Sequence, residues 1–172
     1  MTEGAVRGEE GVVVLLRRGV LALAALGVAG VAVELALLRH WNGVVQVIPW
    51  LGLGAAAVAV ALVAVRPTPA RLRLARLIAL GVLGVAAFGV LEHVLGNHDA
   101  GPLDAEHGEG WESLSQATRW WYAITETVGP SPTFAPAALA QIVLLVLLAT
   151  VRHPALGRVG GRPRAAVEAA RG

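Results

Sequence analysis

Four long apolar stretches constrain the fold of this chain more than any other feature of its sequence. They cover about residues 20–41, 44–65, 74–95 and 134–151. About 20 apolar residues in a helix are needed to cross the ~30 Å hydrocarbon core of a bilayer. The composition agrees, because 56% hydrophobic residues and a mean hydropathy of +0.65 are typical of membrane proteins. The sequence therefore predicts an all-α protein, a bundle of four transmembrane helices.

The stretches divide the chain into two tails and one membrane domain. Residues 1–18 and 153–172 are predicted to be cytoplasmic tails, and residues 19–152 form the four-helix domain, with an outer loop at 97–133. Arg17–Arg18 followed by an apolar run also outlines a signal peptide. We prefer a span, because the run continues past any plausible cleavage point and three more spans follow it.

The distribution of charge predicts the orientation. All 14 basic residues are arginines, and they gather in the two tails and in residues 66–76, whereas the loop after the third span holds six acids and one base. Cytoplasmic loops of membrane proteins carry the excess of arginine. We therefore expect a multi-pass protein of the inner (plasma) membrane, with both termini in the cytoplasm. The expected partner is the lipid bilayer, with other membrane subunits or a homo-oligomer as further options, and not nucleic acid.

The outer loop contains a second helical pattern. Apolar residues recur at helical spacing at Trp111, Leu114, Ala117, Trp121, Ile124 and Val128. This spacing predicts an amphipathic helix over residues 112–128, lying along the membrane surface or capping the bundle.

Several kinds of chemistry are excluded by composition. The chain has no cysteine, and Met1 is its only methionine, so thiolate sites, iron–sulfur clusters and thioether copper sites of its own are excluded. It also lacks a glycine-rich phosphate loop and a nucleophile elbow.

Polar residues interrupt the apolar stretches on one side only. Each predicted span carries at least one, and all lie in the outer half of the membrane domain, with Glu34 about 10 Å deep by helical rise. These candidate site residues are Glu34, His40, Gln46, Glu92, His93, Asn97 and Gln141. Ionisable groups inside a span are costly and often functional, so we expect these side chains to converge.

Three interpretations of this cluster are open. Glu34, His40 and His93, with Glu92 or His98, are candidate ligands of a divalent metal ion, because imidazole and carboxylate suit several transition metals. The same groups suit a proton relay or an outward-facing substrate pocket. They are also explained by hydrogen bonds that only fix helix packing. The leading functional hypothesis is a non-enzymatic transport or accessory subunit, and the alternative is a metal-dependent membrane oxidoreductase.

Two other patterns concern the spans themselves. Arg71, Arg73 and Arg76 are candidates for binding anionic lipid headgroups, or simply determine topology. Small residues in the spans predict close contacts between helices. The glycines concerned are Gly27, Gly30, Gly52, Gly54, Gly81, Gly84 and Gly89.

The first hairpin and the end of the third span carry a resemblance. Glu34, His40, Gln46 and Pro49 form one part of the pattern, and residues 93–97 (H-x-x-G-N) form another. The fourth span adds Ala135–Pro136, Gln141 and His153–Pro154. With these motifs the chain resembles an uncharacterised family of small bacterial four-span integral membrane proteins. The resemblance implies the topology and the choice of residues, and it implies no reaction.

Overall fold

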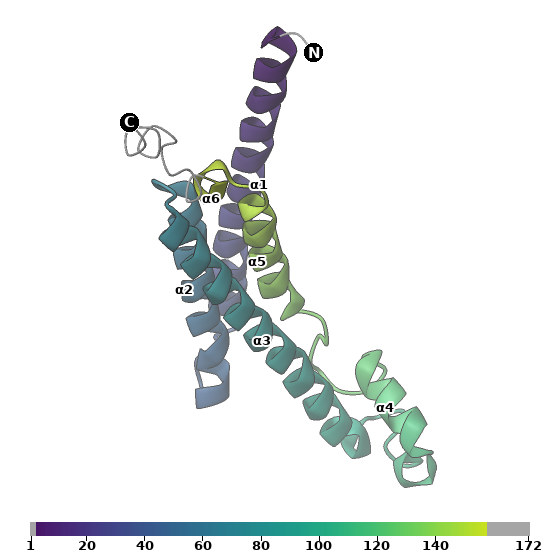
Figure 1. Cartoon of the computed structure of the whole chain (residues 1–172). Helices are drawn as coiled ribbons and strands as arrows, with labels where there is room; N and C mark the ends of the chain where they lie inside the picture. Colours follow the sequence, from purple (N-terminus) through teal and green to yellow (C-terminus); the bar gives the residue numbers. More distant parts are fainter. Residues whose placement is uncertain (1–2, 158–172) are drawn as a thin grey trace, which may run out of the picture.

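The computed structural model describes residues 3–157, with side chains from Gly11 onward, and this part of the chain is helical without strands. The elements are α1 (Glu3–Leu37), α2 (Val44–Ala64), α3 (Pro69–Ala100), η1 (Gly101–Leu103), η2 (Trp111–Ser113), α4 (Gln116–Ile124), α5 (Ala137–Thr150) and α6 (Pro154–Gly157). Helices α1, α2, α3 and α5 pack together, and α4 lies against the C-terminal end of α3 (Figure 1). The predicted all-α class is confirmed.

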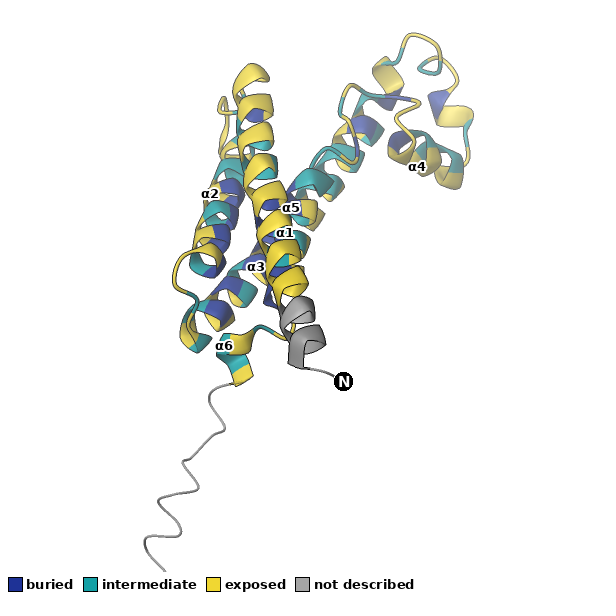
Figure 2. Cartoon of the chain, turned by 90° about the horizontal axis from the view of Figure 1, so that it is seen from above, coloured by how far each residue is buried: buried dark blue, intermediate teal, exposed yellow. Residues whose placement is uncertain are grey.

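Three of the helices are long and apolar enough to cross a membrane: α1 from Gly11, α2, and α3 with its extension to Leu103. Their outward faces are apolar as well. Leu37 is 79% exposed and Leu51 69% exposed, and exposed residues line the outer side of α1 (Figure 2). Such extensive exposed apolar surface is expected where lipid, not water, surrounds the helices.

The first helix differs from its predicted bounds at both ends. It is one continuous helix from Glu3 with no proline in its sequence, so the helix begins well before residue 19, where the predicted tail meets the first span. It ends at Leu37 instead of residue 41, because Arg39 takes a left-handed backbone conformation with φ of 50°.

The third helix is longer than predicted, whereas α2 lies within one residue of its predicted range. The Thr68 hydroxyl accepts the Arg71 amide at the start of α3, and Pro69 occupies its first turn. At the other end α3 continues past residue 95, the predicted limit of the third span, through Gly96 and Asn97 to Ala100. Its 32 residues give a length of about 48 Å, and the helix carries α4 away from the other helices (Figure 1).

The fourth predicted span contains a shorter helix. α5 has 14 residues and a length of about 21 Å, which is less than the thickness of the hydrocarbon core. It begins at Ala137, after a series of tight turns in which the amides of Ala135, Ala137 and Ala138 each bond three residues back. α6 follows within the predicted C-terminal tail, whose residues 158–172 lie outside the described part of the chain.

Small residues make close helix contacts at only some of the predicted positions. A Cβ atom on Gly27 would lie 2.8 Å from Ile142, and one on Gly89 would lie 2.8 Å from Pro136, so α1 and α3 both approach the α5 segment closely. Gly52 approaches Val85 in the same way. In contrast, Gly30, Gly54, Gly81 and Gly84 face open space. The rest of the helix contact surface is largely alanine and valine.

The helix predicted over residues 112–128 is shorter, and its packed face is different. α4 begins after the Ser115 cap, whose hydroxyl accepts the Thr118 amide, and Glu126 beyond its end has φ of 58°. Trp111 and Val128 are buried as expected. Trp121 and Ile124, from the same predicted stripe, are exposed, and Ala123 is the buried residue of α4.

Candidate functional site

A pocket of about 280 Å³ opens where the C-terminal end of α1, the N-terminal end of α2, α3 and the segment before α5 meet. Most of its wall is apolar. The apolar lining comprises Val31, Leu35, Leu38, Val45, Ile48, Pro49, Val85, Phe88, Gly89, Ala135, Pro136 and Leu139. The remaining lining residues are polar, and these include most of the predicted site.

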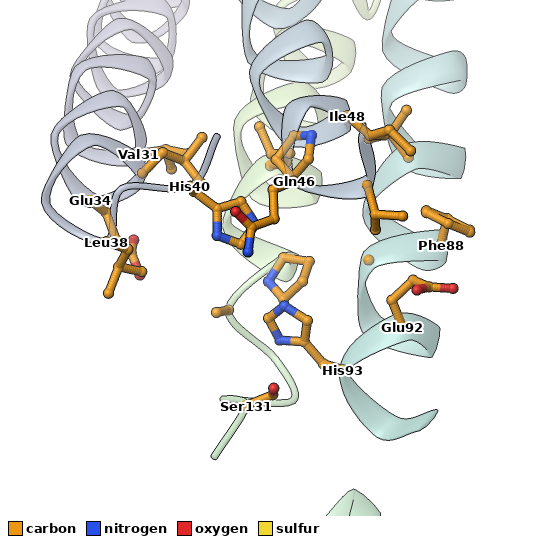
Figure 3. A pocket seen from close by; sticks show the side chains of 18 residues that line it. Val31, Glu34, Leu38, His40, Gln46, Ile48, Phe88, Glu92, His93 and Ser131 are labelled. Atoms are coloured by element: carbon orange, nitrogen blue, oxygen red, sulfur yellow. The ribbon is translucent and has the colours of Figure 1, made fainter. Parts of the chain in front are cut away.

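Five of the seven candidate residues line this pocket: Glu34, His40, Gln46, Glu92 and His93. They come from α1, the connection after it, α2 and α3. Figure 3 shows His40, Gln46 and His93 near the centre, with Glu34 and Glu92 at opposite edges. The structure therefore brings together groups that lie up to 59 residues apart in the chain, the interval from Glu34 to His93.

His93 is held in one orientation by the chain before α5. Its Nδ1 lies 2.6 Å from the carbonyl oxygen of Pro132. Because a carbonyl can only accept a hydrogen bond, Nδ1 carries the proton and donates it. In the neutral ring, Nε2 then keeps its lone pair and is an acceptor. Figure 3 shows the ring directed toward the side of the pocket where His40 lies.

His40 lies in the connection between α1 and α2 and is fixed through its backbone. The indole Nε1 of Trp50 donates to the His40 carbonyl at 2.8 Å, and Trp50 packs on Trp41 with ring centroids 6.4 Å apart. The pKa of His40 is lowered, first by burial of the ring and second by the nearby His93. Two facing imidazoles disfavour a second positive charge.

Gln46 closes the start of α2. Its side-chain oxygen accepts the backbone amide of Asn42 at 2.8 Å. This bond resembles the reciprocal half of a capping box, shifted by one residue. The oxygen is occupied by this contact, so the amide nitrogen is the group that Gln46 offers to the pocket as a donor.

The two carboxylates have no partner among the described residues: neither Glu34 nor Glu92 makes a side-chain hydrogen bond or ion pair there. Glu34 is exposed at the pocket edge and lies three residues before the end of α1. By helical rise that is about 5 Å from the helix end, not the 10 Å expected from sequence. The earlier depth was too large because α1 ends four residues sooner than predicted.

Asn97 lies outside the pocket and has a structural role. It is fully buried, and its side-chain nitrogen donates to the carbonyls of Ala123 and Ser131 and contacts the hydroxyl of Thr133. Its side-chain oxygen accepts the Ser131 amide. Asn97 thus joins α3 to the end of α4 and to the chain leading into α5.

Gln141 also lies outside the pocket. It is exposed on α5, whereas the next two residues, Ile142 and Val143, are buried. The rotation of α5 therefore turns the Gln141 side chain to a different side from the one packed in the bundle.

The metal hypothesis gains no support from the geometry. Among the side chains described, those of residues 11–157, no three histidine, aspartate or glutamate groups lie close enough together to hold a metal ion. Glu34, His40 and His93 share a pocket, but Glu34 lies at its edge, apart from the rings (Figure 3). The residues are not arranged as a ready ligand set.

No family model, no curated protein and no solved structure matches this chain.

One of the three candidate lipid-binding arginines is used inside the protein. Arg76 donates from Nε to the Thr150 hydroxyl at 2.9 Å and from Nη2 to the Thr150 carbonyl at 2.8 Å. Arg17 of α1 donates to the Ala149 carbonyl at 2.9 Å. Cations at a helix C-terminus satisfy its free carbonyls and its dipole. Arg73 is exposed, and Arg71 makes only a 3.4 Å contact with the Arg66 carbonyl.

Sequence reasoning missed two parts of the site. The Pro132 carbonyl and the Ser131 side chain contribute from the segment before α5, which was predicted as a loop without a role. Phe88, one turn before Glu92 on α3, supplies an aromatic wall. The i, i+4 spacing of Phe88 and Glu92 was visible in the sequence and is the signal that points to it.

Proposed function

We propose that this chain is a four-span integral membrane protein that binds a small ligand in an outward-facing pocket, as a non-enzymatic transport or accessory subunit. One observation carries the proposal. Six polar side chains line one cavity, and two of them, Glu34 and Glu92, make no hydrogen bond or ion pair among the described residues. Groups that served only to fix packing would each have a partner in the chain, as His93 has in Pro132 and Gln46 has in Asn42.

A fourth span is supported by the chain around α5. The turns over residues 133–136 rise by about 2 Å per residue, as in a 3₁₀ helix, and extend the ~21 Å of α5 to about 29 Å. This length is close to that of the hydrocarbon core. α5 also packs against α1, α2 and α3, so the four helices traverse the bilayer as one bundle.

The outward orientation is supported by the two ends of the bundle. Arg17, Arg18, Arg66 and Arg152 gather at one end, and the pocket and the acidic loop lie at the other. The positive-inside rule places the arginine end in the cytoplasm, with both termini, and the pocket on the outer side of a bacterial inner membrane. These features fit the small four-span membrane proteins that the motifs around Glu34 and His93 resemble.

A role as a subunit is supported by Gln141. Its amide is exposed on a helix whose other residues are apolar apart from Thr150 at the end. A polar side chain facing lipid is unfavourable, whereas glutamine forms hydrogen bonds between helices in membranes. A second membrane subunit, or a second copy of this chain, would cover it. No observation favours the metal-dependent oxidoreductase over ligand binding.

The test uses two adjacent valines as a matched pair. Val45 lines the pocket, and Val44 is 86% exposed and lies outside it. Val45→Trp fills the cavity, and Val44→Trp adds the same bulk elsewhere. Native mass spectrometry of the purified proteins should show a bound small molecule on the wild type and on Val44→Trp, but not on Val45→Trp. Identical spectra from the two folded variants would count against a ligand site.

A further inference from the structure

We infer that the ligand of the pocket is a lipophilic cation, an ammonium group carried on an aromatic or branched apolar body. This inference rests on the proposed function and names its ligand class. It starts from the charges in the pocket lining, which contains two carboxylates, Glu34 and Glu92, and no arginine. Arg39, the base nearest in sequence, is not among the lining residues.

The two histidines do not offset this negative charge. Nδ1–H of His93 is directed to the Pro132 carbonyl, so the nitrogen left for the pocket is an acceptor in the neutral ring. The pKa of His40 is lowered, first by burial of its ring and second by the nearby His93, so its positive charge is disfavoured. The pocket therefore offers two carboxylates without a partner among the described residues and one or more imidazole lone pairs, and Gln46 is its side-chain amide donor.

Both carboxylates attract a cation in the pocket. Figure 3 shows Glu34 and Glu92 at opposite edges, with the Glu92 carboxylate directed away from the histidine rings. A positive charge on the ligand is attracted by both carboxylates, since neither has a partner among the described residues. The same carboxylates would repel an anionic ligand, and a neutral ligand would leave them without a partner.

The walls define the rest of the ligand. Aromatic faces attract cations, and Phe88 of α3 lines the pocket beside the Glu92 turn. The other wall residues are aliphatic side chains and the prolines 49 and 136. A volume of about 280 Å³ suits a small organic molecule instead of a bare metal ion, because binding a bare ion would leave the apolar wall without contact.

Three probes of one shape test the charge. Benzyltrimethylammonium is the cation, neopentylbenzene replaces its nitrogen by carbon, and phenylmethanesulfonate is an anion of similar size. Apparent dissociation constants are taken from ligand-dependent thermal stabilisation of the purified full chain. The cation should bind at least tenfold more tightly than the neutral probe, and the anion should not bind.

The variants separate this inference from the proposed function. Glu34→Gln and Glu92→Gln, singly and together, should each reduce the advantage of the cation, and Glu109→Gln, an exposed outer-loop control, should not. If the neutral probe binds as tightly as the cation and Val45→Trp abolishes both, the pocket binds ligands and the cation inference is wrong. If no probe binds the wild type, or Val45→Trp leaves binding unchanged, neither proposal survives.

Discussion

Asn97 and Ser131 are joined in both directions: the Asn97 side-chain nitrogen donates to the Ser131 carbonyl at 2.8 Å, and its oxygen accepts the Ser131 amide at 2.9 Å. The contact closes a long loop, because the two residues are separated by 34 positions. It also fixes the segment that supplies the Pro132 carbonyl to His93. The outer loop and the pocket are therefore coupled through one buried amide.

We predict that Asn97→Ala destabilises the protein by about 3 kcal/mol, since it removes one hydrogen bond to the buried Ala123 carbonyl and two to the backbone of Ser131. Thermal unfolding in detergent measures the loss. Hydrogen exchange should rise over residues 123–133 before it rises in α1 or α2.

The matched control is Asn42→Ala, which removes the other asparagine of the chain. Only its backbone amide is bonded, to Gln46, so its side chain should be dispensable. An equal loss of stability in both variants would show that Asn97 does not join the loop to the helices.

Gly89→Ala should destabilise the protein by overpacking the contact between α3 and Pro136 at one side of the pocket. The added Cβ would lie 2.8 and 3.0 Å from two carbons of Pro136, and overpacking of this kind costs about 1–3 kcal/mol. Gly81→Ala on the same helix meets nothing within 4 Å and should be neutral or slightly stabilising. Comparison of the two unfolding midpoints checks the prediction, and a reversed order would contradict the close approach of α3 to Pro136.

Arg76→Ala should cost about 2 kcal/mol, because it removes two charge-assisted hydrogen bonds to Thr150 at the end of α5. Arg73→Ala removes the same charge three residues earlier from an exposed position and should change stability by less than about 0.5 kcal/mol. Chemical denaturation measures both. Equal losses would mean that the arginine charge matters only for topology, and not as a helix cap.

The stability of the turn that follows η1 should depend on pH through the carboxyl group of Asp104. Its carboxylate accepts the backbone amide of His107, the ring nitrogen of His107 and the amide of Glu106, and these bonds lower the pKa of Asp104. The stabilisation is therefore fully present above the ordinary aspartate pKa and is lost as the pH falls through the lowered value. Hydrogen exchange of residues 104–111 should show this loss.

Asp104→Asn provides the control for that titration. The amide oxygen still accepts hydrogen bonds but carries no charge, so the variant should remove the acid-dependent step over the same residues. A step of unchanged size in Asp104→Asn would assign it to another group.

The elements that were predicted accurately from sequence are those whose limits are set locally. α2 follows the Asn42–Gly43 turn and ends where Pro67 approaches, and the structure places it within one residue of the predicted range. Thr68 and Pro69 likewise carry the start signal of α3 in the sequence, although the apolar run alone placed that start five residues late. The length of an apolar run and the start and stop signals beside it can be recognised in the sequence without knowing which other helix it packs against.

The features that could not be predicted depend on contacts between distant residues. Asparagine is common at helix ends, but the Asn97 side chain forms hydrogen bonds with residues 26 and 34 positions away, and α3 continues past it. Gln141 was placed in the site from its position along the fourth span, but the rotation of α5 depends on how Ile142 and Val143 pack. Trp121 has the spacing predicted for a buried face, but it is exposed, and Ala123 is the buried residue of α4.

The most direct test of an outward-facing pocket uses the absence of cysteine from the chain. Gln46→Cys and Ser131→Cys introduce single thiols in the pocket lining, and Thr68→Cys introduces one in the connection between α2 and α3. A membrane-impermeant maleimide should label the first two in intact cells and Thr68→Cys only after permeabilisation. Val45→Trp should slow labelling of both pocket thiols at least tenfold. Labelling of Thr68→Cys from outside, or no effect of Val45→Trp on either pocket thiol, would contradict the account.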